Sequence, residues 1–284
     1  MIYNKKSLGQ NFLIDSNIKR KIVNSVNIKN KDVTILDTLN SLPHTDNTEF
    51  RCDLHPKWSF SGKYISDDKR FKLFKQTNHG VVAARNFGIR KSVNRYITFL
   101  DADDIWDQDF LMASLNFRKE HGKPLAITHA AYFRFKVKDN KINSSLVKPP
   151  LIINHKNILK KNFMPLLTVL IDRDLINGFY FENQRPEDYR LWIQLIYIKK
   201  FESISIKKAL GFYRISNNQR SKNKFKNLIR IFKFFSELPN TNFFEKIFHT
   251  LNWILHNSLQ RIFSKKIKNE EKLEYLSSIL IKYK

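Results

Sequence analysis

The chain has 284 residues, 42% of them hydrophobic, which is enough apolar material to bury a sizeable core. Its 51 Lys and Arg against 26 Asp and Glu give a net charge of +25, which favours anionic partners. Because the positive charge is spread along a chain rich in Lys, Asn and Ile, we expect no nucleic-acid partner. The single cysteine, Cys52, excludes a disulfide framework within the chain. The seven glycines do not have the spacing of a dinucleotide-binding or Walker loop. No apolar run reaches the length of about 20 residues that a membrane span needs.

The beginning of the chain predicts little regular structure. Within residues 1–40, apolar spacing indicates a helix around 18–26, and a short apolar run predicts a strand at 33–36. Residues 41–66 carry prolines and many Ser, Thr and Asp without periodicity, so we expect a loop-rich join there. Because the start of the sequence lacks the apolar core of a signal peptide, we expect a cytoplasmic protein that can touch the inner face of the membrane.

From residue 67 onward, strand and helix patterns alternate. Apolar runs predict strands at 71–74, 96–100 and 125–137, and helical spacing predicts helices at 83–92, 108–120, 156–170 and 187–199. A strand, a helix and a second strand in this order indicate a crossover connection and a largely parallel sheet.

The last part, residues 223–284, is predicted to be a basic amphipathic helical tail. Residues 218–284 contain 14 Lys and Arg against five Asp and Glu, and apolar residues recur at helical spacing from Phe243 to Phe263. Two interpretations stay open: this apolar face packs on its own domain, or it lies in the surface of a membrane.

Three carboxylates directly follow the apolar strand at 96–100, namely Asp101, Asp103 and Asp104. Ligands of open α/β sheets bind beyond the carboxyl ends of the strands. A hard divalent ion such as Mg²⁺ or Mn²⁺ is held by one or two carboxylates together with substrate phosphate oxygens, so this motif indicates handling of a diphosphate. The alternative is that Asp103 or Asp104 caps the next helix.

A second acidic motif comes later, where Pro186 precedes Glu187 and Asp188 at the start of a predicted helix. Acids in a first turn suit the helix dipole. A carboxylate there can equally act as a general base towards an acceptor hydroxyl. The residue types alone leave both roles open.

The order of these motifs resembles family-2-type inverting glycosyltransferases. The resemblance covers about residues 67–222 and rests on these segments: Asn78-His-Gly80-Val-Val-Ala-Ala-Arg85-Asn86, Tyr96-Ile-Thr-Phe-Leu-Asp101-Ala-Asp103-Asp104, Glu187-Asp188-Tyr-Arg-Leu-Trp192 and Tyr213-Arg214-Ile-Ser216. It implies a GT-A-like fold, that is, an α/β fold with a mixed, mostly parallel sheet flanked by helices. The Pro-x-Tyr-Asn-like turn and the paired aspartates that usually follow the first strands of this family are missing, so we expect those strands to be lacking.

The resemblance also implies roles for particular residues. Asp101 and Arg85 would bind the nucleotide-sugar donor, Asp103 would ligate the metal, Mg²⁺ or Mn²⁺, and Asp188 would be the catalytic base. Arg214 is a further donor-binding candidate, because its charge can neutralise the diphosphate. The acceptor would be a saccharide or glycolipid of the cell envelope.

The first 37 residues instead resemble the start of ribosomal RNA adenine dimethyltransferases, through Lys5-Lys-Ser-Leu-Gly-Gln-Asn-Phe-Leu-Ile-Asp15. The glycine-rich loop for S-adenosylmethionine that follows in that family is missing, since Asp37-Thr-Leu-Asn-Ser41 stands there. We therefore predict a fused chain, in which the start of a methyltransferase precedes a metal-dependent glycosyltransferase. The missing first strands would impair this glycosyltransferase. A catalytically inactive basic binding protein is the alternative, and an RNA methyltransferase is a remote one.

Overall fold

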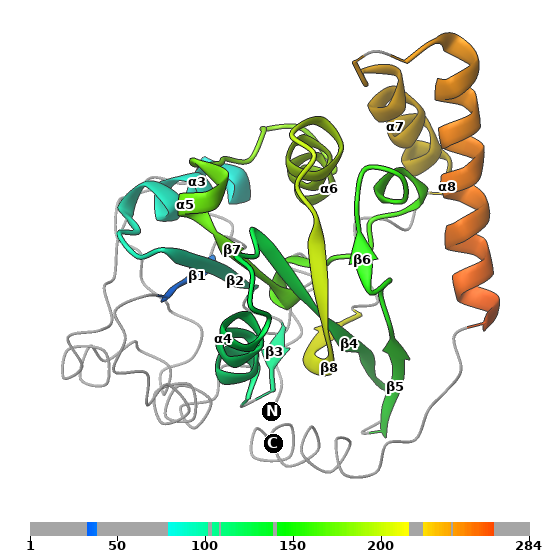
Figure 1. Ribbon diagram of the computed structural model, residues 1–284. Coiled ribbons are helices and arrows are strands. Elements are labelled where there is room, and N and C mark those ends of the chain that lie inside the picture. The colour runs from blue at the N-terminus through cyan, green and yellow to red at the C-terminus, as the bar shows by residue number, and fades with distance from the viewer. Residues whose placement is uncertain are drawn as a thin grey trace, which may run out of the picture.

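The structure, a computed structural model, describes residues 33–38, 79–101, 104–107, 109–138, 141–215, 224–239 and 241–263. Eight strands within these ranges form one sheet in the order β1-β2-β7-β4-β8-β3, with β5 paired to β4 and β6 to β8 (Figure 1). The strands are β1 (Val33–Thr38), β2 (Tyr96–Asp101), β3 (Ile105–Trp106), β4 (Ile127–Lys138), β5 (Lys141–Val147), β6 (Ile152–Ile153), β7 (Val169–Asp172) and β8 (Ser203–Arg214).

Helices cover both faces of this sheet. They are α3 (Gly80–Lys91), α4 (Phe110–Glu120), α5 (Arg173–Ile176), α6 (Glu187–Trp192), α7 (Lys224–Ser236) and α8 (Phe243–Phe263), with short turns η1 (Ile158–Lys160) and η2 (Leu166–Thr168) and a continuation of α6 by η3 (Ile193–Ile198). Side chains from α3, α6, η3 and α7 share one apolar core with β2, β4 and β7. Helix α4 packs in a second core that includes Leu100 of β2 and Ala130 of β4. Alternating strand residues thus feed two cores, because successive side chains point to opposite faces.

The predicted mixed α/β sheet flanked by helices is confirmed, with one correction to its strand directions. Among the described pairings, β1 with β2 and β4 with β8 are parallel, whereas the other five are antiparallel. The expected majority of parallel pairings is therefore wrong. The crossover argument holds only for strands joined by a helix, whereas β4 and β5 follow one another directly as a hairpin.

The strand predicted at 33–36 is confirmed and slightly longer, and it changes how the start of the chain is divided. Each residue of β1 lies opposite a residue of β2, from Val33 beside Tyr96 to Thr38 beside Asp101. We predicted residues 1–40 as a unit separate from the glycosyltransferase-like part. Because β1 is hydrogen-bonded to β2, residues 33–38 belong to the same sheet.

The predicted helix at 156–170 is wrong, because no α-helix forms in this segment. The chain there forms the short turns η1 and η2 and then enters β7, which is buried throughout. The β-branched residues Val169 and Ile171 favour the extended structure of β7. The predicted strand at 71–74, the helix at 18–26 and the join at 41–66 lie outside the described residues.

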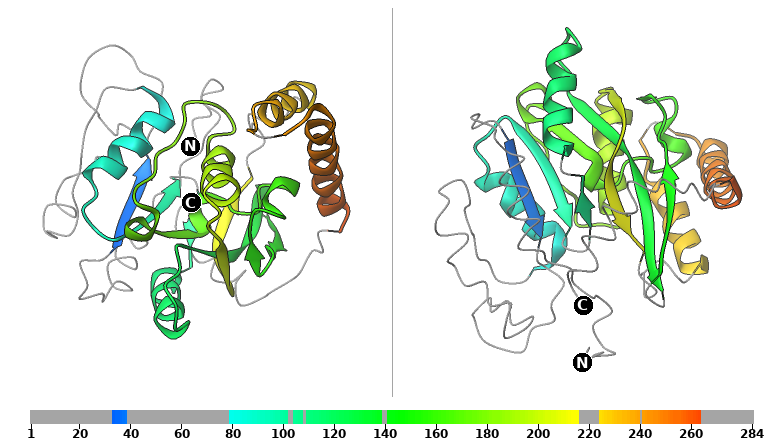
Figure 2. Two further views of the ribbon diagram at one scale, coloured as in Figure 1. Left: turned by 45° about the horizontal axis from the view of Figure 1, so that its top comes forward. Right: turned by 90° about the horizontal axis from the view of Figure 1, so that it is seen from below.

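The tail predicted as helical at 223–284 contains two helices in its described part, α7 and α8. Both lie at the opposite end of the sheet from β1 and α3 (Figures 1 and 2). Ile231, Phe234 and Phe235 of α7 are buried in the main core. Among the described residues no helix is both long and apolar enough to cross a membrane.

A buried histidine in β4 gives the fold a predictable pH dependence. His129 is fully buried, its Nε2 is 2.9 Å from the Pro150 carbonyl oxygen and its Nδ1 is 2.8 Å from Ser203 Oγ. Burial lowers the pKa of His129 to about 4. The unfolded chain therefore binds the proton first, so the free energy of unfolding should fall by about 2 kcal/mol between pH 7 and pH 5.

Urea unfolding at the two pH values measures this effect. His129→Gln should remove most of the difference, whereas replacing the exposed His121 by Gln should retain it. An equally steep pH dependence in His129→Gln would contradict the assignment.

Candidate active site

A buried arginine joins the two acidic motifs that stand 86 positions apart. Arg85, on α3, is 5% exposed, and its Nη2 donates to both carboxylate oxygens of Asp101, at 2.8 and 3.1 Å. Its Nη1 lies 3.8 Å from Oε1 of Glu187, the first residue of α6. Arg85 therefore brings the end of β2 and the start of α6 to one place.

The guanidinium group of Arg85 packs against an aromatic ring. It lies over the ring of Phe181, 5.5 Å from its centroid, and Phe181 packs edge-on against Phe99 of β2 at 5.3 Å. Cation–π contact and the low polarity of these rings strengthen the ion pairs. Burial alone would lower the pKa of Arg85, but the charge and hydrogen bond of Asp101, together with the charges of Asp188 and Glu187, outweigh this effect and raise it. The guanidinium group thus stays positive.

Asp188 lies beside this pair and is half-buried. Its Oδ2 accepts a hydrogen bond from Asn162 Nδ2 at 3.0 Å, and its Oδ1 accepts one from the Tyr189 backbone N–H at 2.8 Å. Burial raises the pKa of Asp188, and the charge of Glu187 raises it further, against the opposing effects of Arg85 and the two hydrogen bonds. A carboxylate with a raised pKa is a stronger base, which suits proton removal from a hydroxyl.

Helix α6 is held in place by two large buried side chains. Tyr189 donates from its hydroxyl to the Ile158 carbonyl oxygen, and Trp192 donates from Nε1 to the Met164 carbonyl oxygen, both at 2.8 Å. These bonds tie α6 to the segment that carries Asn162. The hydrogen-bond partner of Asp188 is therefore fixed relative to its helix.

Arg214 lies at the end of β8, next to the segment that follows β2. Its backbone N–H donates to Asp104 Oδ1 at 3.0 Å, and its guanidinium group lies 5.3 Å from the centroid of the Phe135 ring. The Tyr213-Arg214 motif thus meets the acidic motif in space. Asp103, the predicted metal ligand, lies outside the described residues.

Two residues of this site were not predicted. Asn162 comes from an irregular segment whose sequence carries no signal for a role. Asn86 follows Arg85 and exchanges two hydrogen bonds with the backbone of Phe181, at 2.8 and 2.7 Å, which fastens α3 to the chain before α6. The signal that could have identified Asn86 is its position directly after Arg85 in the motif from Asn78 to Asn86.

Carboxylates are the groups that this site offers to a metal ion. No three His, Cys, Asp or Glu side chains of the described residues gather as a metal cage. Mg²⁺ does not need one, because it is commonly held by one or two carboxylates, water and phosphate oxygens. Asp101 is 34% exposed, and two more carboxylates follow it within three positions, so the chemistry of this segment fits a hard divalent ion.

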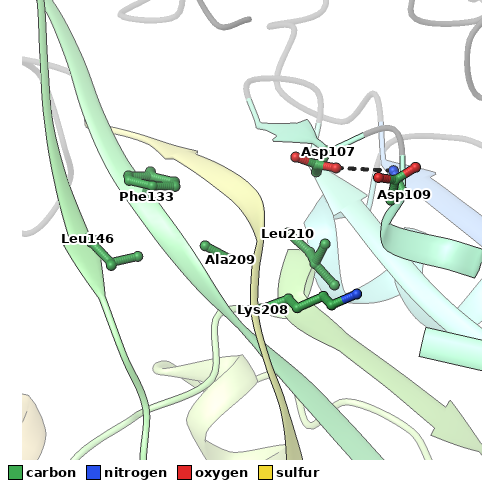
Figure 3. Close-up of a pocket in the computed structure, with 7 residues that line it drawn as sticks. All are labelled: Asp107, Asp109, Phe133, Leu146, Lys208, Ala209 and Leu210. Atoms are coloured by element: carbon green, nitrogen blue, oxygen red, sulfur yellow. Dashed lines mark hydrogen bonds between the residues drawn. The ribbon is translucent and has the colours of Figure 1, made fainter. Parts of the chain in front are cut away.

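A cavity of about 310 Å³ lies away from these residues, between β3, α4, β4, β5 and β8. Asp107 and Asp109 line it together with apolar side chains and Lys208 (Figure 3). Asp107 Oδ1 accepts a hydrogen bond from the Asp109 backbone N–H at 3.1 Å, just before α4 begins. None of the predicted site residues lines this cavity.

Comparison with known proteins agrees with the motifs. The family described as Glycosyl transferase family 2 matches residues 45–177, so the match begins earlier than the predicted boundary at residue 67. The methyltransferase-like first 37 residues lie before this range, and the structure describes only residues 33–38 near them. Their resemblance to a methyltransferase stays a prediction that no comparison supports.

Two curated relatives match over most of their length. An uncharacterised glycosyltransferase of Haemophilus influenzae is 34% identical over 186 residues, which are 65% of this chain and 73% of that protein. The UDP-Glc:α-D-GlcNAc-diphosphoundecaprenol β-1,3-glucosyltransferase WfgD of Escherichia coli is 31% identical, over 66% of this chain and 72% of that protein. Among solved structures, S. aureus TarS in complex with UDP-GlcNAc is 16% identical, with a TM-score of 0.49 over 90% of this chain and 75% of that one. The two curated relatives and the family match show that this chain is an enzyme of glycosyltransferase family 2.

Proposed function

We propose that the chain is a metal-dependent inverting glycosyltransferase that transfers a sugar from a UDP-sugar to a lipid-linked saccharide at the inner face of the membrane. The observation that carries this proposal is the cluster of Asp101, Arg85, Glu187 and Asp188, which unites the donor and acceptor motifs. The name of the E. coli relative supplies the donor and acceptor classes, a UDP-sugar and a diphosphoundecaprenol-linked saccharide.

In the proposed reaction, Asp188 removes the proton from an acceptor hydroxyl group. The resulting oxygen attacks the anomeric carbon on the face opposite the diphosphate, the bond from this carbon to the phosphate oxygen breaks, and UDP leaves, which inverts the configuration. Asp101 and Arg85 bind the donor, and Arg214 offsets the charge of its diphosphate.

Asp103 would hold Mg²⁺ or Mn²⁺, with Asp101 close by in the chain. The ion supplies positive charge against the negative charge that develops on the departing diphosphate. Strand β1 beside β2 supports an active enzyme over one impaired by a missing edge of the sheet.

The metal role can be tested with Asp103→Asn. We expect Mn²⁺ to raise the midpoint of thermal unfolding in the presence of a UDP-sugar, and this shift to disappear in the variant. UDP release onto a lipid-linked saccharide should fall at least about a hundredfold, since a ligand of the leaving diphosphate is lost. The control is Asp109→Asn, a carboxylate that lies eight positions after Asp101, just before α4 begins.

Full turnover by Asp103→Asn would contradict metal binding by this residue. If no nucleotide sugar shifts the unfolding of the wild-type protein, with or without Mn²⁺, the alternative of an inactive basic binding protein gains support. Labelled S-adenosylmethionine that fails to bind would exclude the methyltransferase.

A further inference from the structure

Helix α8 carries a stripe of large apolar side chains that face solvent. The stripe consists of Phe244, Phe248, Leu251 and Leu255, which are between 54% and 80% exposed. Their spacing of four, three and four positions places them on one side of the helix, over about 16 Å of its length. Two Phe and two Leu side chains left in water on one helix face indicate a surface that something covers.

The other side of α8 is the one that packs on the protein. Thr250 is buried, Trp253 packs against the main core, and the ring of His249 lies 5.9 Å from that of Phe235 of α7. Since this inner side already anchors the helix, the stripe is not needed to hold α8 in place. Its residues can therefore serve an external contact.

The charge of the helix pair identifies the kind of partner. Helices α7 and α8 contain six Lys and Arg but one acidic residue, Glu245, and the whole chain has a net charge of +25. Two copies of a chain with this net charge repel one another, whereas a bilayer of anionic lipids attracts it. Exposed apolar side chains in a helix pair with an excess of Lys and Arg are the composition of helices that lie in a membrane surface.

The same helix pair is joined directly to the helix of the proposed base. The ring of Tyr189, next to Asp188, lies 5.0 Å from that of Phe234 and 6.5 Å from that of Phe235. Arg190 Nη2 donates to Glu237 Oε2 at 2.5 Å. Contact of α8 with a bilayer would thus fix the orientation of α6 towards that bilayer.

We infer that the stripe of α8 is a docking surface for an anionic membrane, which places the active site beside a lipid-linked acceptor. The purpose of this surface rests on the proposed function, but its binding to lipid needs neither donor nor acceptor. An experiment can therefore refute membrane docking without refuting the proposed function, and the reverse.

The experiment measures co-sedimentation of the full chain with vesicles of equal parts phosphatidylglycerol and phosphatidylethanolamine. The wild-type protein should bind, more weakly at high salt and more weakly to pure phosphatidylcholine. Phe248→Ser combined with Leu251→Ser should lower the vesicle affinity at least about tenfold, because two apolar side chains no longer enter the bilayer. Both positions are exposed, so circular dichroism should show an intact fold.

The matched control replaces two exposed apolar residues elsewhere, Val93→Ser with Leu151→Ser, and should bind vesicles as the wild type does. Transfer to a soluble saccharide acceptor should be equal in all three proteins. Absence of binding to the anionic vesicles, or equal binding by the stripe variant, would overturn the inference. A concentration-dependent dimer that the stripe variant abolishes, without vesicle binding, would overturn it in favour of a second copy of the chain.

Discussion

Asp188→Asn is expected to reduce kcat/KM for sugar transfer by about a thousandfold, the size of a typical general-base contribution. The amide has nearly the shape of the carboxylate but cannot accept the proton of the acceptor hydroxyl. Donor binding should be retained, because Asp101 and Arg85 are unchanged. UDP release measures the rate, and the thermal shift caused by a UDP-sugar with Mn²⁺ measures donor binding.

The control is Asp174→Asn, since Asp174 is also an acid in the first turn of a helix, α5. If Asp188 served only the helix dipole, Asp188→Asn and Asp174→Asn would lose a similar, small amount of stability and neither would lose activity. A variant Asp188→Asn that keeps more than about a tenth of the wild-type rate would contradict the role of a base.

The pH dependence provides a second measure of the same residue. A base acts in its ionised form, so the rate should rise with pH and reach half its maximum above the ordinary Asp pKa of 3.8. The shift is upward because burial and Glu187 disfavour the charged form of Asp188. Asp188→Asn should lose this rise along with its activity.

The main elements of the fold could be predicted where the pattern of apolar residues is long and regular. The strand ending at Asp101, helix α4 and the helical start at Glu187 follow from periodicity and from Pro186 before the first turn. The direction of strand pairing could not be predicted, because apolar periodicity does not reveal which strands become neighbours. Strand β7, for example, lies between β2 and β4 in the sheet although it follows both of them in the sequence.

The active site could be predicted as two motifs but not as one cluster. Each acidic motif has a local explanation, a cap or a helix dipole, and in the described part of the chain it is Arg85 that connects them. That an Arg in the middle of α3 is buried rather than solvated depends on Phe181, 96 positions later, which no local pattern indicates. Asn162 likewise reaches Asp188 through a tertiary contact.

Arg85→Met is expected to affect both stability and the pH profile of the reaction. Methionine fills much of the same space without the charge, so Asp101 and Glu187 lose their interactions with this guanidinium group. Asp101 is a third exposed and water can solvate it, so the free energy of unfolding should fall by about 2–3 kcal/mol, less than the about 3–5 kcal/mol that breaking a fully buried ion pair costs. Urea unfolding at neutral pH measures this loss.

The same substitution removes a positive charge that lowers the pKa of Asp188. The pKa of Asp188 should therefore rise, and the half-maximal point of the rate should move to higher pH. Arg90→Met is the matched control, because Arg90 is an exposed residue of the same helix, and it should change the unfolding free energy by no more than about 0.5 kcal/mol. A merely structural Arg85 would lower stability and leave the pH profile in place, so an unmoved profile in Arg85→Met would contradict its electrostatic link to the base.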